Sequence, residues 1–326
     1  MKLSLTRLTA ASAMALALIS ASSVAMAQAY PNRIVRLIVP FPPGAGADTT
    51  VRLFTPKLTD FFGQQVIVDN RAGAAGNIGA EAASKAVPDG YTLLVAPSSL
   101  ATSQSLYKDL KFDITRDFAP VAMLASAPFV AAIHPSVPAK TVKEFVAYAK
   151  TNPGKLNFAS TGAGGINHLS GELFKSMAGI DIVHVAYKGT NTAIPDLIGG
   201  QVSLMFTSTV SSLPHVKAGK LRALGVTGLK RSTAAPDIPT VSESGLTGYE
   251  SATWFAVMGP AGVPRDIVNS VNATIIKVAN TPEVRDALLS QGAEPSNFTP
   301  EQVGAYVKNE VVKWAKVVKD AGVKLE

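Results

Sequence analysis

The chain has 326 residues, a formal net charge of +7, a charged fraction of 16% and no cysteine. The lack of cysteine excludes disulfides, cysteine–zinc sites and thiol catalysis. The basic residues are scattered and form no stripe interleaved with aromatic residues, which argues against nucleic-acid binding despite the positive charge. The four histidines lack the close spacing of a metal site, so we expect neither a metal nor a cofactor.

The first 27 residues have the pattern of a secretory signal peptide. Two positive residues precede an apolar, alanine-rich stretch from Leu8 to Val24, and Ala25–Ala27 form a small-x-small cleavage motif. A retained membrane anchor is the alternative, but the apolar run is short and broken by serines. Cleavage before Gln28 leaves 299 residues with a net charge of +5, which is enough for a large core in one or two domains.

The segment from Arg33 to Arg52, RIVRLIVPFPPGAGADTTVR, predicts a strand, a tight turn and a helix. The apolar run Ile34–Val39 is typical of a strand buried on both faces, and the prolines after it end that strand. The slim turn at residues 44–47 is followed by Asp48 and Thr49, which are residue types that cap helices. Such a turn presents free N–H groups at the positive end of a helix dipole. We therefore interpret this loop as one that holds a carboxylate.

The same alternation continues through the first half of the chain. The first helix is expected to end at Phe62, and a second slim glycine loop at Asn70–Gly79 opens a helix that runs to about Ala86. Further strands are expected at Gln65–Asp69 and Tyr91–Ala96. Strands joined by helical crossovers pair in parallel, so this part of the chain predicts a mainly parallel sheet.

A second α/β unit follows a long apolar run from Phe118 to Pro135, which is predicted as two extended segments that join one lobe to another. The strands expected in the second unit are Leu156–Ser160, Asp181–Val185, Val202–Phe206 and Leu221–Val226. The helices expected there are Thr141–Lys150, one ending near Met177, Thr192–Ile198 and Leu213–Lys217.

The last part of the chain predicts a return to the first lobe. Ser251–Met258 has the pattern of a strand, and helices are expected at Asp266–Ala279, Pro282–Ser290 and Pro300–Lys319. The last helix has an apolar stripe at Val303, Tyr306, Val307, Val311, Trp314 and Val318. We expect this stripe to pack in the core.

The predicted fold class is therefore α/β, with two α/β lobes linked by crossings near residues 118–130 and 248–256. Ligands of open α/β sheets bind beyond the carboxyl ends of the strands, so two facing lobes form a cleft there. The loops that qualify are rich in small residues and poor in charge, and they are residues 41–49, 72–79, 97–99, 160–168, 187–191 and 207–209. Such walls can hold a small anion with N–H and hydroxyl donors.

Other interpretations of these loops have weaker support. Residues 44–49, GAGADT, partly match a dinucleotide fingerprint with Asp69 near the ribose position, but the third glycine is absent. A tight turn without a ligand is a second alternative, which three similar loops make less attractive. Hydrolase chemistry needs a G-x-S-x-G pentapeptide, which does not occur, and the loops hold no pair of carboxylates, so no catalytic residue is expected.

Several side chains near the loops have two interpretations. His168 can line the cleft or pack locally, whereas His184 lies in a predicted strand and is expected to be structural. Tyr187 is expected in the cleft at the end of that strand. Phe41 and Trp254 can supply apolar walls or pack in the core.

These residues resemble those of a known family. From about Tyr30 to the C-terminus, the chain closely resembles the Bug-type solute-binding receptors of tripartite tricarboxylate transport systems. The motifs that carry the resemblance are VPFPPGAGADTTVR, VDNRAGAAGNIGAEAASKAVPDGYTLL, NPGKLNFASTGAGGINHLSGELFK, VHVAYKGTNTAIPDLIGGQV, AGKLRALGVT, PDIPTVSESGLTGYE and EVVKWAKVVKDAG. The resemblance implies a two-lobed, type II periplasmic binding protein of a Gram-negative cell. Such a protein closes on a small carboxylate and delivers it to a permease with a large and a small subunit.

The resemblance also implies how the carboxylate is held. In the family, backbone N–H groups at the positions of Gly44–Asp48 and Ser160–His168 hold it, often through bridging waters. Many relatives carry an acid–amide pair where this chain has Thr207 and Ser208. Because such an acid can pair with a ligand amino group, we expect a mono- or dicarboxylate, aromatic acids included, rather than an amino acid.

We therefore expect a monomeric periplasmic solute-binding receptor without catalytic activity. Its lobes are expected to comprise residues 28–122 plus 250–326 and residues 123–249. The alternatives are a periplasmic enzyme that acts on a small carboxylic acid and a ligand-sensing subunit of a signalling receptor. The expected ligand-binding residues are Phe41, Pro43, Gly44, Ala45, Gly46, Ala47, Asp48, Ala74, Asn77, Ser98, Ser99, Ser160, Thr161, Gly162, Ala163, Gly164, Gly165, His168, Tyr187, Gly189, Thr190, Thr207, Ser208 and Trp254.

Overall fold

The computed structural model describes residues 30–324, and the predicted signal peptide at residues 1–27 lies outside this range. Residues from Arg33 onward form one compact unit. Within the described part of the chain, no helix combines the length and the apolar character needed to cross a membrane.

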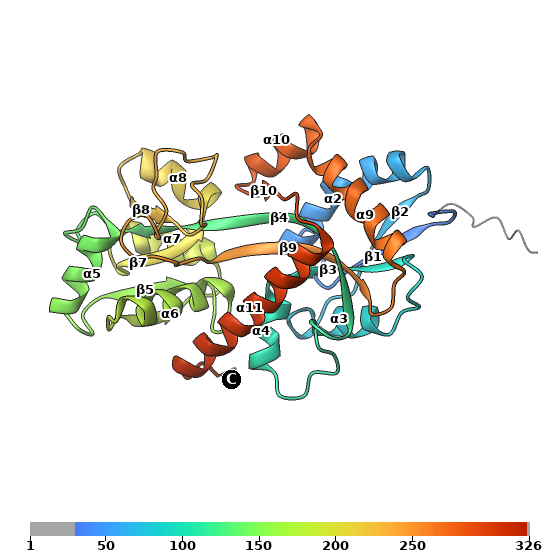
Figure 1. Cartoon of the computed structure of the whole chain (residues 1–326). Coiled ribbons are helices and arrows are strands. Elements are labelled where there is room, and N and C mark those ends of the chain that lie inside the picture. The colour runs from blue at the N-terminus through green and yellow to red at the C-terminus, as the bar shows by residue number, and fades with distance from the viewer. Residues whose placement is uncertain (1–29, 325–326) are drawn as a thin grey trace, which may run out of the picture. The chain divides into compact units, whose positions relative to one another are not determined.

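The first half of the sheet is built from parallel strands beside two antiparallel ones (Figure 1). Strand β1 (Val35–Val39) lies between β2 (Val66–Asn70) and β3 (Thr92–Pro97), and both pair with it in parallel. Strand β9 (Ala252–Pro260) lies antiparallel to β3 and separates it from β4 (Phe118–Ile133). The parallel order confirms the prediction made from the helical crossovers.

The second half of the sheet repeats this architecture. Strand β5 (Asn157–Ser160) lies between β6 (Val183–Ala186) and β7 (Leu204–Ser208), and both pair with it in parallel. Strands β7 and β8 (Arg222–Val226) pair antiparallel with the end of β4. The short strand β10 (Glu294–Pro295) pairs with the middle of β4.

Strand β4 belongs to both halves and corrects one expectation. Its residues Phe118–Pro128 pair with β9, and Phe129–Ile133 pair with β7 and β8. The sequence predicted two extended segments here, whereas the structure has one strand of 16 residues. Pro120 is accommodated because the register of β4 against β9 shifts between Pro120 and Ala122, and such irregularities tolerate a residue that cannot donate to the ladder. Pro128 is the last residue of β4 that pairs with β9. Figure 1 shows β4 and β9 side by side between the two groups of helices.

Helices cover both halves of the sheet. The described helices are α2 (Gly46–Phe62), the 3₁₀ turn η1 (Ala74–Gly76), α3 (Asn77–Ser84), α4 (Ser99–Leu106), α5 (Val142–Thr151), α6 (Ile166–Ala178), α7 (Thr190–Ile198), α8 (Thr209–Lys217), α9 (Arg265–Ala279), α10 (Pro282–Ser290) and α11 (Pro300–Asp320).

Helices α2, α8 and α4 differ from the sequence prediction. Helix α2 is capped at Ala45 and begins at Gly46, so Asp48 lies in its first turn rather than at its N-cap. Helix α8 begins at Thr209, four residues before the expected start, because Ser208 caps it by accepting the N–H of Ser211. Helix α4 was not predicted, because its serine- and threonine-rich sequence shows no apolar face.

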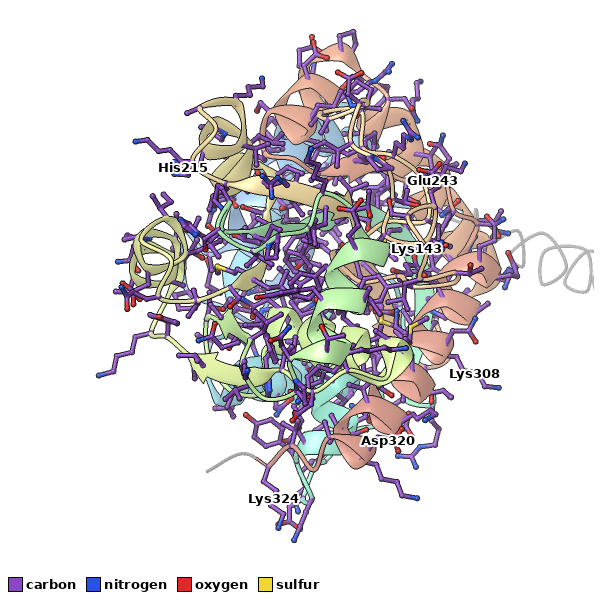
Figure 2. All side chains as sticks on the ribbon, turned by 90° about the vertical axis from the view of Figure 1, so that its left-hand side faces the viewer. Lys143, His215, Glu243, Lys308, Asp320 and Lys324 are labelled. Carbon is purple, nitrogen blue, oxygen red and sulfur yellow. The ribbon has the colours of Figure 1, made fainter. Side chains whose placement is uncertain are left out.

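Helix α11 is tied to the core through a buried carboxylate. Val303, Val307, Trp314 and Val318 are buried, which confirms that the apolar stripe packs in the core. Glu310 is buried, and its Oε2 accepts the indole N–H groups of Trp254 and Trp314, each at 2.9 Å. The charged side chains Lys143, Glu243, Lys308 and Asp320, labelled in Figure 2, are exposed.

Candidate functional site

The carboxyl ends of the parallel strands in the two halves point at each other across one short part of β4. In the first half, the end of β3 at Pro97 pairs with Phe255 of β9, which pairs with Ala125 of β4. In the second half, the end of β7 at Ser208 pairs with Phe129 of β4. Strand β3 runs in the same direction as β4 and β7 runs against it. Four residues of strand span about 13 Å, so the loops that follow these strands converge.

The first glycine loop is fixed by the carboxylate of Asp48, which is only 2% exposed. Its Oδ2 accepts the N–H of Gly44 and the Nε–H of Arg52, both at 2.9 Å, and its Oδ1 accepts the amide of Asn70 at 2.9 Å. The same amide of Asn70 donates to the carbonyl of Phe41. The hydrogen bond from Arg52 is the main cause that lowers the pKa of Asp48 to about 2, so the carboxylate is ionised at neutral pH.

A run of amides remains available just beyond this network. The N–H of Gly44 is held by Asp48, and that of Ala45 donates to the carbonyl of Pro42. Within the described residues, the N–H groups of Gly46, Ala47 and Asp48 make no hydrogen bond. They are the first three amides of the 17-residue helix α2, where the helix dipole favours an anion. Of the amides of Gly44–Asp48, which were expected to hold a carboxylate, those of residues 46–48 are therefore the ones available to donate.

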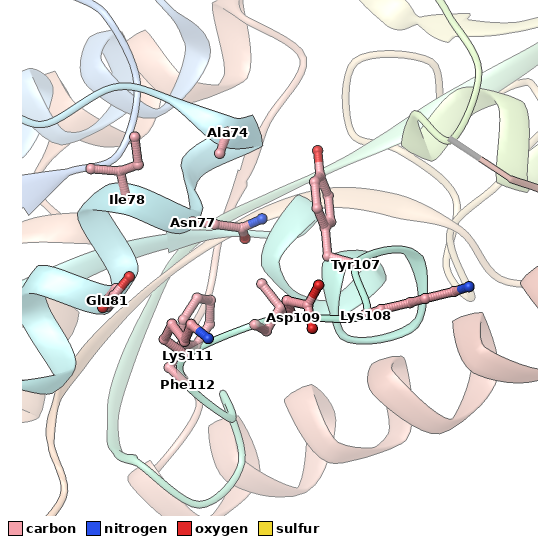
Figure 3. Close-up of a pocket in the computed structure, with 10 residues that line it drawn as sticks. Ala74, Asn77, Ile78, Glu81, Tyr107, Lys108, Asp109, Lys111 and Phe112 are labelled. Atoms are coloured by element: carbon pink, nitrogen blue, oxygen red, sulfur yellow. The ribbon is translucent and has the colours of Figure 1, made fainter. Parts of the chain in front are cut away.

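The second glycine loop places an unpaired amide beside a cavity. Ala74 and Ala75 both have positive φ angles, of 47° and 55°, in the 3₁₀ turn before α3. The side chain of Asn77 is buried, and neither its Nδ2 nor its Oδ1 has a partner among the described residues. Asn77 lines a cavity of about 380 Å³ between this turn and the segment Tyr107–Phe112 (Figure 3).

The loop after β3 is bound to its neighbours. The N–H of Ser98 donates to the carbonyl of Trp254, and the hydroxyl of Ser99 lies 3.5 Å from the carbonyl of Ala75. Ser98 is buried, whereas Ser99 is partly exposed. Of these two predicted site residues, Ser99 is therefore the more accessible.

The glycine loop of the second half, residues 160–168, is fixed by uncharged groups. The hydroxyl of Ser160 accepts the N–H of Gly162 at 3.2 Å, and Nδ1 of His168 accepts the N–H of Gly164 at 3.0 Å. Within the described residues, the N–H groups of Ala163, Gly165 and Ile166 make no hydrogen bond. Gly165 caps helix α6 and Ile166 begins it, so this loop also ends in free amides at a helix N-terminus.

Two histidines stack beneath this loop. The rings of His168 and His184 lie 3.7 Å apart at an interplanar angle of 15°. Nε2 of His184 is 2.7 Å from the hydroxyl of Ser160, and Nε2 of His168 is 3.8 Å from a carboxylate oxygen of Glu172. Burial, followed by the charge that His168 can carry, lowers the pKa of His184 to about 4, so this ring is neutral at pH 7.

The remaining predicted site residues of the second half lie at the ends of β6 and β7. The hydroxyl of Tyr187 donates to Asp196 at 2.7 Å, and burial together with this bond raises the pKa of Tyr187 to about 12. Gly189, with a φ of 152°, precedes α7, which begins at Thr190. Ser208 caps α8, and the buried Thr207 makes no side-chain hydrogen bond within the described residues.

The two aromatic residues with open interpretations occupy different environments. Trp254 is fully buried and its indole is bound to Glu310, so the structure places it in the core. Phe41 is partly exposed, and its ring lies 3.2 Å from the position that a Cβ on Gly76 would take. Phe41 therefore lies between the first and second glycine loops, and of these two predicted residues it is the one that lies near them. No group of three or more potential metal ligands occurs in residues 30–324.

Comparison with known proteins gives a consistent result. Residues 50–323 match the family model described as "Tripartite tricarboxylate transporter family receptor". The chain is 36% identical over 326 residues to Protein BugT of Bordetella pertussis, covering 99% of this chain and all of that protein. It also resembles the solved structure of Rpa4515 from R. palustris with adipate (36% identity, TM-score 0.71, 90% and 99% of the two chains). MatC from Rhodopseudomonas palustris with bound malate is a further neighbour (31% identity, TM-score 0.68, 89% and 100%).

Proposed function

This chain belongs to the tripartite tricarboxylate transporter family of receptors, and we propose that it is a periplasmic receptor that captures a small carboxylate between its two lobes. The observation that carries the proposal is the pair of free amide runs, at Gly46–Asp48 and around Gly165. Their loops follow β1 and β5, which lie next to β3 and β7, the strands whose carboxyl ends face each other across β4. Each run lies at a helix N-terminus, and neither is neutralised by a nearby acid other than Asp48, which is itself paired with Arg52.

The proposed ligand carries one or two carboxylates and no amino group. Thr207 and Ser208 stand at the end of β7, where an acid would be needed to pair with a ligand cation. The hydroxyl of Ser208 is engaged in capping α8, so this position offers no negative charge. Two relatives whose structures are described with adipate and with malate make dicarboxylates the first compounds to test.

The proposed mechanism is capture by closure. The lobes, residues 28–122 plus 250–326 and residues 123–249, contribute one amide run each, so a ligand gains its full set of hydrogen bonds only when both are in reach. Such a ligand favours the closed arrangement over the open one by its differential affinity for the two. The closed receptor would then deliver the ligand to the large and small subunits of a membrane permease.

Thermal-shift screening of the mature, monomeric protein tests the ligand class. We expect adipate, malate and related dicarboxylates to raise the melting temperature in a concentration-dependent way, because a ligand that binds only the folded state stabilises it by mass action. Aspartate and glutamate are the matched controls, since they differ by an amino group. A clear preference for the amino acids, or no response to any carboxylate, contradicts the proposal.

Three further measurements address the protein's wider role. A turnover assay with the bound ligand is expected to show no product, and conversion of the ligand would point to an enzyme. Mass spectrometry of ligand that co-purifies with the native protein identifies the compound directly. Pull-down with membrane fractions is expected to recover permease subunits, whereas recovery of a histidine kinase alone would favour a sensing role.

A further inference from the structure

We propose that His168 is a positioning residue for the ligand: it withdraws the N–H of Gly164 from the second-half glycine loop and so fixes which neighbouring amides the loop offers. The inference rests on the proposed function, because it assigns a role within the same site. It differs from the sequence expectation that His168 lines the cleft as a ligand contact.

The burial and orientation of His168 favour an indirect role. The residue is 5% exposed, and both ring nitrogens face protein atoms. Nδ1 accepts the N–H of Gly164 at 3.0 Å, so this nitrogen carries a lone pair and the hydrogen of the neutral ring is on Nε2. Nε2 in turn faces Glu172, 3.8 Å away. Nδ1 is thus occupied by the loop, and Nε2 lies in the interior beside a buried carboxylate without a hydrogen bond to it.

The surroundings hold the ring in this orientation. One face of the imidazole stacks on His184 at 3.7 Å, and the ring of Phe158 is also stacked at 6.1 Å. The carboxylate of Glu172 is bound by Lys175 at 3.2 Å, and contacts with His168 and Lys175 hold the pKa of Glu172 below its ordinary value although burial raises it. A ring that is buried, stacked on one face and hydrogen-bonded at Nδ1 has little freedom to turn.

The backbone of the loop shows what the histidine accomplishes. Gly162 and Gly164 have φ angles of 142° and 73°, values that let the chain alternate the direction of successive N–H groups. The amides of Gly162 and Gly164 point inward, to Ser160 and His168, while those of Ala163 and Gly165 have no partner in the described chain. If His168 no longer accepts the N–H of Gly164, the alternating orientation of these amides is no longer fixed, and the outward amides of Ala163 and Gly165 lose their defined positions.

The same logic extends to His184. The hydroxyl of Ser160 accepts from Gly162 and lies 3.1 Å from the carbonyl of Gly162, and Nε2 of His184 is 2.7 Å away. These contacts are satisfied together when Ser160 donates to the carbonyl and His184 donates to Ser160. The stacked pair thus fixes two consecutive inward amides of one loop.

Substitutions that move the acceptor by one atom test the proposal. In His168→Asn, Oδ1 takes nearly the place of Nδ1, so it can accept from Gly164. In His168→Gln the acceptor lies farther out, near the place of Nε2, and in His168→Leu there is none. We expect His168→Asn to bind adipate or malate within about threefold of the unchanged protein, and the other two to bind about tenfold or more weakly, since tenfold corresponds to about 1.4 kcal/mol.

Amide hydrogen exchange of Gly164 in the ligand-free protein provides a readout that does not depend on the proposed function. We expect protection in the unchanged protein and in His168→Asn, and fast exchange in the Gln and Leu variants. Circular dichroism and urea unfolding check that each variant is folded, and His168→Gln serves if the Leu variant is not. Equal protection and equal affinity in the Asn and Gln variants would overturn the inference. Failure of all forms to bind a carboxylate, with the exchange pattern as expected, would overturn the proposed ligand class alone.

Discussion

The glycine loop before α2 and the glycine loop before α6 both present free backbone amides, but different side chains hold the two loops in place. In the first, an ionised carboxylate, Asp48, gathers the N–H of Gly44, the guanidinium of Arg52 and the amide of Asn70. In the second, the hydroxyl of Ser160 and the stacked imidazoles of His168 and His184 hold the loop. The ring of His184 is uncharged at neutral pH. Both leave a run of amides at a helix N-terminus without partners in the described chain.

Solvent access explains the difference. The side chain of Arg52 is 50% exposed, so the buried charge of Asp48 is compensated by a cation that remains hydrated. In the second loop, His168 is only 5% exposed and packs against His184 and Phe158. The inward acceptors of this loop are a hydroxyl and a ring nitrogen, so the loop amides are held there without a carboxylate. The comparison teaches that each free amide run has a fixed inward partner, and that the charged partner is the one paired with an exposed counterion.

The largest expected effect tests the feature that both loops share. Gly46→Leu and Gly164→Leu are each expected to weaken carboxylate binding at least about a hundredfold, because a side chain would occupy the place of the anion and forfeit charged hydrogen bonds. A Cβ at Gly46 would already lie 3.3 Å from Phe255, and Gly164 has a φ of 73°. Isothermal calorimetry measures the affinity.

Gly219→Leu is the matched control for those variants. Gly219 also has a positive φ, of 68°, and nothing lies within 4 Å of its Cβ position, but it stands in the turn after α8. It should carry the backbone strain without the loss of affinity. Unchanged affinity in Gly164→Leu would remove the second loop from the site.

A second substitution separates the charged loop from the neutral one. Asp48→Ala is expected to lower the free energy of unfolding by about 3 kcal/mol, because it leaves the donors of Gly44 and Asn70 without their charged acceptor. Asp48→Asn retains one acceptor oxygen and is expected to lose about half as much. Urea denaturation measures both, and equal losses would show that the charge is unimportant.

As the pH falls, the loop held by His184 should lose stability before the loop held by Asp48. The pKa of His184 is lowered from 6.5 to about 4 in the folded protein, so the unfolded chain takes up this proton first as the pH falls. Stability from His184 is therefore complete above pH 6.5 and declines toward pH 4. For Asp48, with a pKa lowered from 3.8 to about 2, stability is complete above pH 3.8 and is lost only toward pH 2.

Urea midpoints between pH 7 and pH 3 measure this order. His184→Phe keeps an aromatic ring for stacking and removes the titrating group, so its midpoint is expected to fall less between pH 6.5 and pH 4. An identical fall in both proteins would assign the acid sensitivity to other groups.

The smallest expected effect concerns the turn of the first loop. Gly44 has a φ of 84° and nothing lies within 4 Å of its Cβ position. Gly44→Ala should therefore cost only the strain of a left-handed residue, about 1 kcal/mol, with little change in affinity. A large loss of binding would show that the conformation of Gly44, and not only the acceptor at Asp48, sets the free amides.

The sequence predicted the strand–loop–helix pattern well, because glycine loops and β-branched runs are local signals. It did not predict the inward partners of the loops. Asp48 was assigned to an N-cap, although Arg52 four residues later was a visible sign of a helical ion pair. The hydrogen bond from the N–H of Gly164 to His168 could be suspected from the spacing of four residues. The stacking of His168 on His184, in contrast, depends on the pairing of β5 with β6.

Long-range packing also explains two further features that the sequence did not predict, the burial of Trp254 and the unbroken strand β4. Trp254 is buried because Glu310, 56 residues away, accepts its indole N–H. The unbroken strand β4 depends on a partner, β9, that lies more than a hundred residues later in the chain. Neither relationship leaves a mark within a short window of sequence.

The convergence of Trp254 and Trp314 on one carboxylate has a practical consequence. The chain has two tryptophans, and both donate to Glu310 where β9 meets α11. The tryptophan fluorescence of the protein therefore originates at a single junction. A shift of its emission to longer wavelength reports water entry at that junction, so the protein carries its own optical probe.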